Sequence, residues 1–284
     1  MNKVMKEQEY TLESLYRYGR DVLSSCGIME ADTDAHILLE YAAQIDRSSY
    51  YLHMYDPAGK KTAEMYIKLL NRRAEREPVQ YITGEAYFYG HTFLVTPDVL
   101  IPRQDTEILV AEAEKRLCPG MRVLDLCTGS GCVLLSILNS HHAEGIGSDI
   151  SPAALAVAMQ NQKRLGLQAE WIESDLFTRI SGVFDMIVSN PPYIAADVLG
   201  ELQPEVIGHE PVTALDGGLK GLENIKRIIR EAPAFLKKDG WLLLEIGFDQ
   251  GDAVKRLLAE QGFKETVIIK DLEHRERVAA GRRS

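Results

Sequence analysis

The stretch Asn190-Pro191-Pro192-Tyr193, which follows the apolar run Phe184–Val188, combines residue types that could do chemistry. Proline has no N–H and a fixed φ, so the two prolines end a strand and hold the chain extended. The Asn190 side-chain oxygen and the Pro191 carbonyl can accept the two N–H bonds of a planar amino group. Tyr193 can cover the face of that group. We therefore expect Asn190, Pro191 and Tyr193 to be catalytic in a methyl transfer to this nitrogen, with Pro192 completing the acceptor site.

A second polar stretch, Cys127-Thr128-Gly129-Ser130-Gly131, follows the apolar run Arg122–Leu126. Its glycines let a ligand approach the backbone closely, and the helix that follows offers free N–H groups at its N-terminus. Such a turn is weak evidence by itself, because nucleotide and dinucleotide binders share it. No Walker lysine follows the turn, which argues against an NTPase.

Acidic residues close the strands that follow the turn. Asp149 ends the next strand about 20 residues on, where it can accept both hydroxyls of a ribose. Asp175, followed by Leu176, comes after a third strand, where an adenine amino group can donate to it. With Asp125 they form a series of three strand-end acids, which fits S-adenosylmethionine better than a nicotinamide. A dehydrogenase remains the minor alternative.

Alternating strands and helices must position these groups. After Gly120 we expect strands at Arg122–Leu126, Gly145–Ser148, Ala169–Ile172, Phe184–Val188 and Trp241–Ile246. Helices are predicted at about 131–139, 152–165, 222–237 and 250–261, and a closing strand pair at Val267–Lys270 and Arg277–Ala280. This alternation predicts an α/β fold whose sheet has helices on both faces. The ligand of such a sheet binds at the carboxyl ends of its strands.

The chain before this region has a different pattern. Apolar residues recur at helical spacing within residues 9–77, and the arginines Arg72, Arg73 and Arg76 are expected on a solvated face. An aromatic, glycine-punctuated stretch then predicts a hairpin. We divide the chain into a helical substrate-binding domain at 1–78, a linker hairpin at 79–102 and a catalytic domain at 103–284.

Composition limits the classes of partner. The net charge is −10, and 45% of the residues are hydrophobic. An acidic chain is a poor match for nucleic acid, whose phosphates favour a basic face. Four irregularly spaced cysteines indicate neither a disulfide framework nor a zinc site, so no metal is expected. No apolar run is long enough to span a membrane, and no signal peptide is evident, which predicts a cytoplasmic protein and no membrane partner.

Together, the glycine-rich turn, Asp149 and the Asn-Pro-Pro-Tyr corner resemble class I methyltransferases that modify a planar nitrogen. Three further stretches narrow the resemblance: Ile101-Pro102-Arg103-x-Asp105-Thr106-Glu107, Glu210-Pro211-x-Thr213-Ala214-Leu215 and Arg275-Glu276-Arg277-Val278-x-x-Gly281-Arg282. With the helical attachment and the hairpin, they resemble the release-factor glutamine N5-methyltransferases, the PrmC/HemK family. The resemblance covers essentially the whole chain.

The resemblance implies a Rossmann-like sheet of seven strands and methylation of the glutamine in the Gly-Gly-Gln motif of class I peptide chain release factors. S-adenosylmethionine would be the donor and S-adenosylhomocysteine the product. The donor contacts would be Cys127 to Gly131, Asp149, Leu176 and Asn190, with Phe88 as an aromatic wall. The glutamine would be held by residues 190 to 193. We expect a monomer that does not bind nucleic acid directly.

Two alternatives remain open from the sequence. A nucleic-acid amino-methyltransferase acting on adenine N6 or guanine N2 would need a basic groove or a target-recognition domain, and neither is visible. A donor-binding scaffold without turnover would not need the Asn-Pro-Pro-Tyr corner. The sequence also departs from the family pattern, because Cys127 replaces the usual first glycine of the turn. A positive φ at that position would strain a cysteine.

Overall fold

The computed structural model describes residues 10–284, and these divide into two compact units. The helical unit holds the chain up to Gly84 together with Pro204–His209. The sheet unit holds Glu85–Gln203 and Glu210–Ser284. The chain therefore leaves the sheet unit once, for six residues, and returns to it at Glu210. The boundaries 1–78, 79–102 and 103–284 remain predictions.

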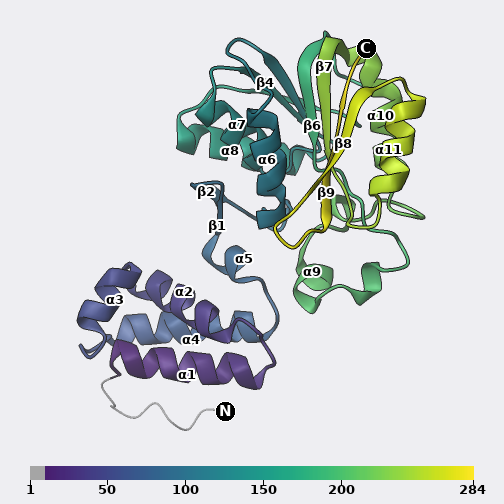
Figure 1. The fold of residues 1–284 in the computed structure, drawn as a ribbon. Helices are drawn as coiled ribbons and strands as arrows, with labels where there is room; N and C mark the ends of the chain where they lie inside the picture. Colours follow the sequence, from purple (N-terminus) through teal and green to yellow (C-terminus); the bar gives the residue numbers. More distant parts are fainter. Residues whose placement is uncertain (1–9) are drawn as a thin grey trace. The chain divides into compact units, whose positions relative to one another are not determined.

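Short helices surround one apolar core in the helical unit (Figure 1). They are α1 (Leu12–Ser25), α2 (Ala31–Ala43), α3 (Arg47–His53), α4 (Lys60–Ala74), α5 (Val79–Thr83) and α9 (Pro204–His209). Thr11 caps α1 by accepting a hydrogen bond from the Ser14 N–H. A Cβ at Gly19 would lie 1.9 Å from the Tyr66 hydroxyl, so only glycine allows α1 and α4 to pack this closely. The predicted helical pattern of this region is present.

Arg73 corrects one expectation for this unit. Its side chain does not belong to a solvated face, because Arg73 is only 6% exposed. Its Nε donates to Asp34 at 2.7 Å, and both terminal nitrogens donate to Glu205 of α9 at 3.1 Å. A buried guanidinium needs such partners, since an unpaired buried charge is costly. The cation therefore joins α2, α4 and α9 in one ion-pair cluster.

The sheet unit begins with a hairpin and continues as an alternating α/β fold. The hairpin is β1 (Glu85–Phe88) and β2 (His91–Leu94). The strands of the main sheet are β3 (Arg122–Leu126), β4 (Glu144–Asp149), β5 (Glu170–Glu173), β6 (Phe184–Ser189), β7 (Leu236–Glu245), β8 (Lys264–Lys270) and β9 (Glu276–Arg282). The helices are α6 (Glu107–Glu114), α7 (Cys132–Ser140), α8 (Pro152–Leu165), α10 (Glu223–Phe235) and α11 (Gly251–Glu260), with short 3₁₀ turns at Gln104–Thr106, Leu199–Glu201 and Val212–Ala214.

The seven strands lie in the order β5-β4-β3-β6-β7-β9-β8. The pairs from β5 to β7 are parallel, and β9 runs antiparallel to both β7 and β8. This is the seven-stranded sheet typical of class I methyltransferases. The strand order reverses between β3 and β6, so the loops after these two strands diverge and leave room for a ligand. The glycine-rich turn follows β3, and Asn190 follows β6.

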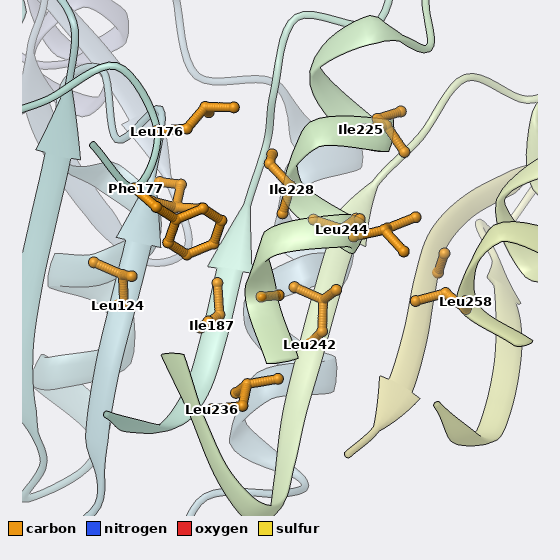
Figure 2. Packing of buried hydrophobic residues seen from close by; sticks show 14 of the residues in the cluster. Leu124, Leu176, Phe177, Ile187, Ile225, Ile228, Leu236, Leu242, Leu244 and Leu258 are labelled. Atoms are coloured by element: carbon orange, nitrogen blue, oxygen red, sulfur yellow. The ribbon is translucent and has the colours of Figure 1, made fainter. Parts of the chain in front are cut away.

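Two apolar layers hold the sheet. On one face, Leu124, Ile187 and Leu242 from three neighbouring strands share an apolar layer with Ile228 of α10 and Leu258 of α11 (Figures 1 and 2). On the other face, α6 and α7 pack against Val123, Val188 and their neighbours. Strand residues of successive positions thus point to opposite layers, as the period of a strand requires. Burial on both faces explains why the strands read as continuous apolar runs.

Two further properties concern the described residues as a whole. None of the helices formed by residues 10–284 is both long enough and apolar enough to cross a membrane. Nor do the histidine, cysteine and acidic side chains in this range form a group of three that could hold a metal ion.

Candidate active site

A cavity of about 410 Å³ opens at the carboxyl ends of β3, β4 and β6, entirely within the sheet unit. This volume lies in the usual range for small-molecule sites. The predicted residues that line it come from three loops and the acceptor corner. They are Cys127, Thr128, Gly129, Ser130, Asp149, Asp175, Leu176, Asn190 and Pro192.

The glycine-rich turn after β3 contains a strained position. Cys127 adopts φ +57°, in the left-handed region that favours glycine. Gly129 and Gly131 also have positive φ, at +55° and +79°. Gly131 caps α7, and a Cβ there would lie 2.9 Å from the Trp171 ring. Gly131 therefore shapes the turn without lining the cavity. The positive φ that would strain a cysteine at position 127 is therefore present.

Asp149 joins the ends of two neighbouring strands. Its Oδ2 accepts from the Gly129 N–H at 2.9 Å, and its Oδ1 accepts from the Ser151 N–H at 2.9 Å. Burial raises the pKa of this carboxyl group, and the backbone N–H groups of Ser151 and Gly129 oppose that effect. A carboxylate oxygen can accept more than one hydrogen bond, so Asp149 keeps lone pairs for ribose hydroxyls.

The third loop is held by its own hydrogen bonds. The Ser174 hydroxyl donates to the Leu176 carbonyl at 2.7 Å and accepts from the Arg179 N–H at 3.0 Å. This turn places Leu176 at φ +49° on the cavity wall. Asp175 Oδ2 accepts from Arg227 at 3.0 Å. Arg227 and Asp175 both line the cavity. Among the described residues, one Asp175 oxygen is paired with Arg227, and the other is left as an acceptor for a ligand.

The acceptor corner is oriented by a side-chain hydrogen bond. Asn190 Nδ2 donates to Thr106 Oγ1 at 3.2 Å, which leaves the Asn190 oxygen as the acceptor of that amide. The Ser189 hydroxyl donates to the Leu126 carbonyl at 2.7 Å and so ties the end of β6 to the end of β3. This bond holds Asn190 beside the glycine-rich turn, as expected for residues that act on one bound molecule.

Tyr193, the last residue of the corner, is not among the residues that line the cavity. Its hydroxyl donates to Glu245 Oε1 at 3.0 Å. Burial raises the pKa of Tyr193, and the neighbouring Glu245 carboxylate raises it further. Pro191 is buried and also stays off the wall. Asn190 and Pro192 therefore line the cavity, and the contacts of Pro191 and Tyr193 with a bound acceptor stay predictions.

The three motif stretches beyond the turn and the corner meet through ion pairs. Arg103, which lines the cavity, donates to Glu210, and Glu210 also accepts from the Ile101 N–H at 3.3 Å. Arg277 contacts Asp105 at 3.1 Å and Asp271 at 3.3 Å. Residues more than a hundred positions apart are thereby fixed around the same cavity.

Phe88 is packed into the core of the sheet unit. It is fully buried, forms an edge contact with Phe93 at a centroid distance of 6.0 Å, and belongs to the apolar layer under α6 and α7. Phe88 is not among the residues that line the cavity, although Val133 of the same layer does line it. The contact of Phe88 with the donor stays a prediction.

Several lining residues received no role from the sequence. The segment before the Ile-Pro-Arg motif and the helix α10 supply most of them. They include Asp98, Val99, Leu100, Asn224 and Arg227. Asp98 to Leu100 directly precede a motif that was recognised, so extending that motif toward the N-terminus would have found them. Asn224 and Arg227 lie on an amphipathic helix, where polar residues are ordinary and carry no such indication.

The residues present fit S-adenosylmethionine. A paired carboxylate at the end of β4 suits a ribose, and the glycine turn with the N-terminus of α7 lets a ligand approach backbone N–H groups. The third loop, with Leu176 on the wall beside Asp175, offers an apolar contact and an acceptor that suit an adenine ring and its amino group. Fold and site together define a class I methyltransferase.

Comparisons with known proteins specify the family. Residues 14–84 match the model of the PrmC N-terminal domain, and residues 103–207 match that of the methyltransferase small domain. A release factor glutamine methyltransferase from Geobacter sulfurreducens is 38% identical over 98% of both chains. One from Cereibacter sphaeroides is 43% identical, over 92% of this chain and 94% of its own. The fold is also similar to a methyltransferase structure from Pyrococcus furiosus, with a TM-score of 0.55 and 16% identity over 75% of this chain and 98% of that one.

The chain belongs to the release factor glutamine methyltransferase family, whose members are S-adenosylmethionine-dependent protein-glutamine N5 methyltransferases.

Proposed function

We propose that this enzyme methylates the side-chain amide nitrogen of the glutamine in the Gly-Gly-Gln motif of class I peptide chain release factors. The observation that supports this most is the oriented Asn190 amide, whose nitrogen is engaged by Thr106 and whose oxygen is left as an acceptor beside the donor cavity. A primary amide offers two N–H donors in one plane, which matches an acceptor pair made by Asn190 Oδ1 and the Pro191 carbonyl.

The donor in this proposal is S-adenosylmethionine, held by the turn at 127–131, Asp149, Asp175 and Leu176. When bound, it supplies an electrophilic methyl group on a sulfonium. Asp149 accepts from the ribose hydroxyls, and its bond to Gly129 keeps the turn in the geometry that a ligand needs. The cavity wall around Leu176 excludes water from the adenine. S-adenosylhomocysteine is the product.

The protein's contribution to the reaction is orientation and electrostatics. An amide nitrogen is a poor nucleophile, because its lone pair is delocalised into the carbonyl. Hydrogen bonds from both N–H groups to Asn190 and Pro191 turn the lone pair toward the cavity and stabilise positive charge that develops on nitrogen. Fixing the attacking atom in this way can contribute several kcal/mol of the barrier. Tyr193, anchored at Glu245, covers the amide face. No base is required before the methyl transfer.

The protein partner is a release factor, and we propose that the helical unit helps to hold it. This unit exposes Tyr51, Leu52 and Tyr55, large apolar side chains within one short stretch at α3. Exposed clusters of this kind are typical of interaction surfaces. In this proposal the enzyme acts as a monomer. Because release factors act in translation, we place the reaction in the cytoplasm.

One assay separates this function from methylation of nucleic acid. Each reaction contains the enzyme and labelled S-adenosylmethionine together with one candidate substrate. The four candidates are a release factor, the same factor with its Gly-Gly-Gln glutamine replaced by alanine, bulk tRNA and duplex DNA. Label on the intact factor alone is the expected result. Label on nucleic acid, or on both forms of the factor equally, would refute the proposal.

A further inference from the structure

Glu245 is a buried carboxylate at the end of β7 with no role in donor binding. It is 1% exposed and is not among the residues that line the cavity. Its Oε1 accepts from the Tyr193 hydroxyl at 3.0 Å, and its Oε2 is buried without a hydrogen-bond partner among the described residues. A buried, partly satisfied carboxylate is costly to keep in a core, so its position beside the acceptor corner calls for a reason.

Thr106 connects this carboxylate to Asn190. The Thr106 hydroxyl accepts from Asn190 Nδ2 at 3.2 Å, and Thr106 lowers the pKa of Glu245, which places its hydroxyl beside that carboxylate. A hydroxyl has a single hydrogen to donate. An ionised Glu245 can only accept, so its unpartnered Oε2 is a suitable acceptor for the hydrogen of Thr106.

We infer that Glu245 is a positioning residue for the methyl acceptor, fixing the Asn190 amide through Thr106 and the Tyr193 ring through its hydroxyl. This inference rests on the proposed function. If the hydrogen bonds from Asn190 through Thr106 to Glu245 ran in the opposite direction, Thr106 would donate to Asn190 and the Asn190 amide would turn around. Its NH₂ group would then face the N–H bonds of the substrate glutamine, which it cannot accept. Glu245 thus controls the chemistry without touching the substrate.

The protonation state of Glu245 sets this polarity. Burial raises the pKa of Glu245 to about 7, while Thr106, Tyr193 and the Arg277 guanidinium lower it and Asp105 raises it. The groups that face it come from β9, the loop after β6, the 3₁₀ turn at Gln104–Thr106 and α7, where Glu245 raises the pKa of Cys132. Above this pKa the carboxylate can only accept hydrogen bonds. Below it the protonated oxygen can donate to Thr106, while the other oxygen can still accept. Wild-type kcat should therefore rise with pH through about 7.

The stability of the fold should change in the opposite sense. A carboxyl group whose pKa is raised on folding stabilises the fold while it is protonated, and this contribution is lost as pH rises through the folded-state pKa of about 7. Glu245→Gln removes the buried charge, so the variant should be at least as stable as the wild type above that pH. A loss of turnover in a protein that is not destabilised distinguishes positioning from a structural role.

The test measures kcat, KM for the release factor and donor affinity of Glu245→Gln across this pH range. We expect kcat to fall roughly tenfold or more above the wild-type pKa, the rise of kcat with pH to vanish, and the donor dissociation constant to stay unchanged. Thr106→Val should give a similar loss, the double variant should be no worse than either single one, and Thr106→Ser should restore turnover.

Glu112→Gln is the matched control, because Glu112 is also buried in the sheet unit but pairs with Lys115 and Arg116 away from the cavity. Its kcat and pH profile should match those of the wild type. Wild-type kcat and an unchanged pH profile in Glu245→Gln would overturn the positioning role while leaving the proposed function intact. An inactive wild-type enzyme in the same assay would refute the proposed function, and the positioning role with it.

Discussion

The carboxylate of Asp149 accepts a hydrogen bond from the Gly129 N–H at 2.9 Å, linking the end of β4 to the glycine-rich turn after β3. One side chain therefore shapes the turn and also presents lone pairs to the cavity. Because this contact lies within the protein, it helps to offset the cost of organising the turn, which otherwise weighs on binding.

Replacement of Asp149 should act through donor affinity. Asp149→Ala removes the brace on Gly129 and the proposed ribose acceptor, and the ribose contact, as a hydrogen bond to a charged group, is worth about 1.5–3 kcal/mol. We expect titration calorimetry to show donor binding weakened roughly 10- to 100-fold. Asp252→Ala on the exposed face of α11 is the control and should bind the donor normally. Unchanged binding in Asp149→Ala would exclude the ribose contact.

Cys127 offers a test of backbone strain. A left-handed conformation costs a non-glycine residue roughly 1–2 kcal/mol, and glycine avoids this at an entropic cost of about 0.5–1 kcal/mol. Because Cys127 adopts φ +57° in the folded turn, we expect the strain to weigh on folding. Cys127→Gly should be more stable than Cys127→Ala by about 1 kcal/mol in chemical denaturation, with equal donor affinity. Equal stability of the two variants would show that the position is unstrained.

Asn190 should be needed for turnover but not for donor binding. Asn190→Ala removes the side-chain acceptor of the substrate amide, and losing one such preorganised group typically costs about 10²–10³ in kcat. Donor affinity by calorimetry should change little, since the ribose and adenine contacts remain. Asn224→Ala, which alters another cavity-lining asparagine, is the comparison and should retain the wild-type kcat. Near-normal turnover in Asn190→Ala would remove its catalytic role.

Arg73 should dominate the stability of the helical unit. Arg73→Met leaves Asp34 without its buried cation and Glu205 with Arg76 alone, a loss of about 3–5 kcal/mol. Arg72→Met is the matched control, because Arg72 is half-exposed and pairs with Glu77; its cost should be below about 1 kcal/mol. Thermal unfolding followed by circular dichroism measures both. Similar losses in the two variants would contradict the buried ion-pair cluster.

Much of the site was predictable because its determinants are local. A glycine turn, an acid or Asn-Pro-Pro directly after an apolar strand indicates residues at the carboxyl edge of a parallel sheet. The cavity accordingly includes Cys127, Asp149, Leu176 and Asn190. The sign of φ at Cys127 was left open, because the sequence does not determine a single backbone angle; the structure gives a positive value.

What could not be predicted has a non-local cause. The burial of Phe88 depends on its contact with Phe93 across the hairpin. Arg73 looks like a solvated helix residue, but its partners lie 39 and 132 positions away. Burial at such positions depends on which segments meet in the fold, and no spacing within the sequence reports that.

Mass spectrometry of a release factor after a single incubation with enzyme and S-adenosylmethionine tests the central claim most directly. Fragmentation of the peptide that contains the Gly-Gly-Gln motif locates the added methyl group on one residue. The predicted result is one methyl group on the side-chain nitrogen of that glutamine, and none when the enzyme is omitted. A methyl group on any other residue, or an unmodified peptide with active wild-type enzyme and bound donor, would contradict the account.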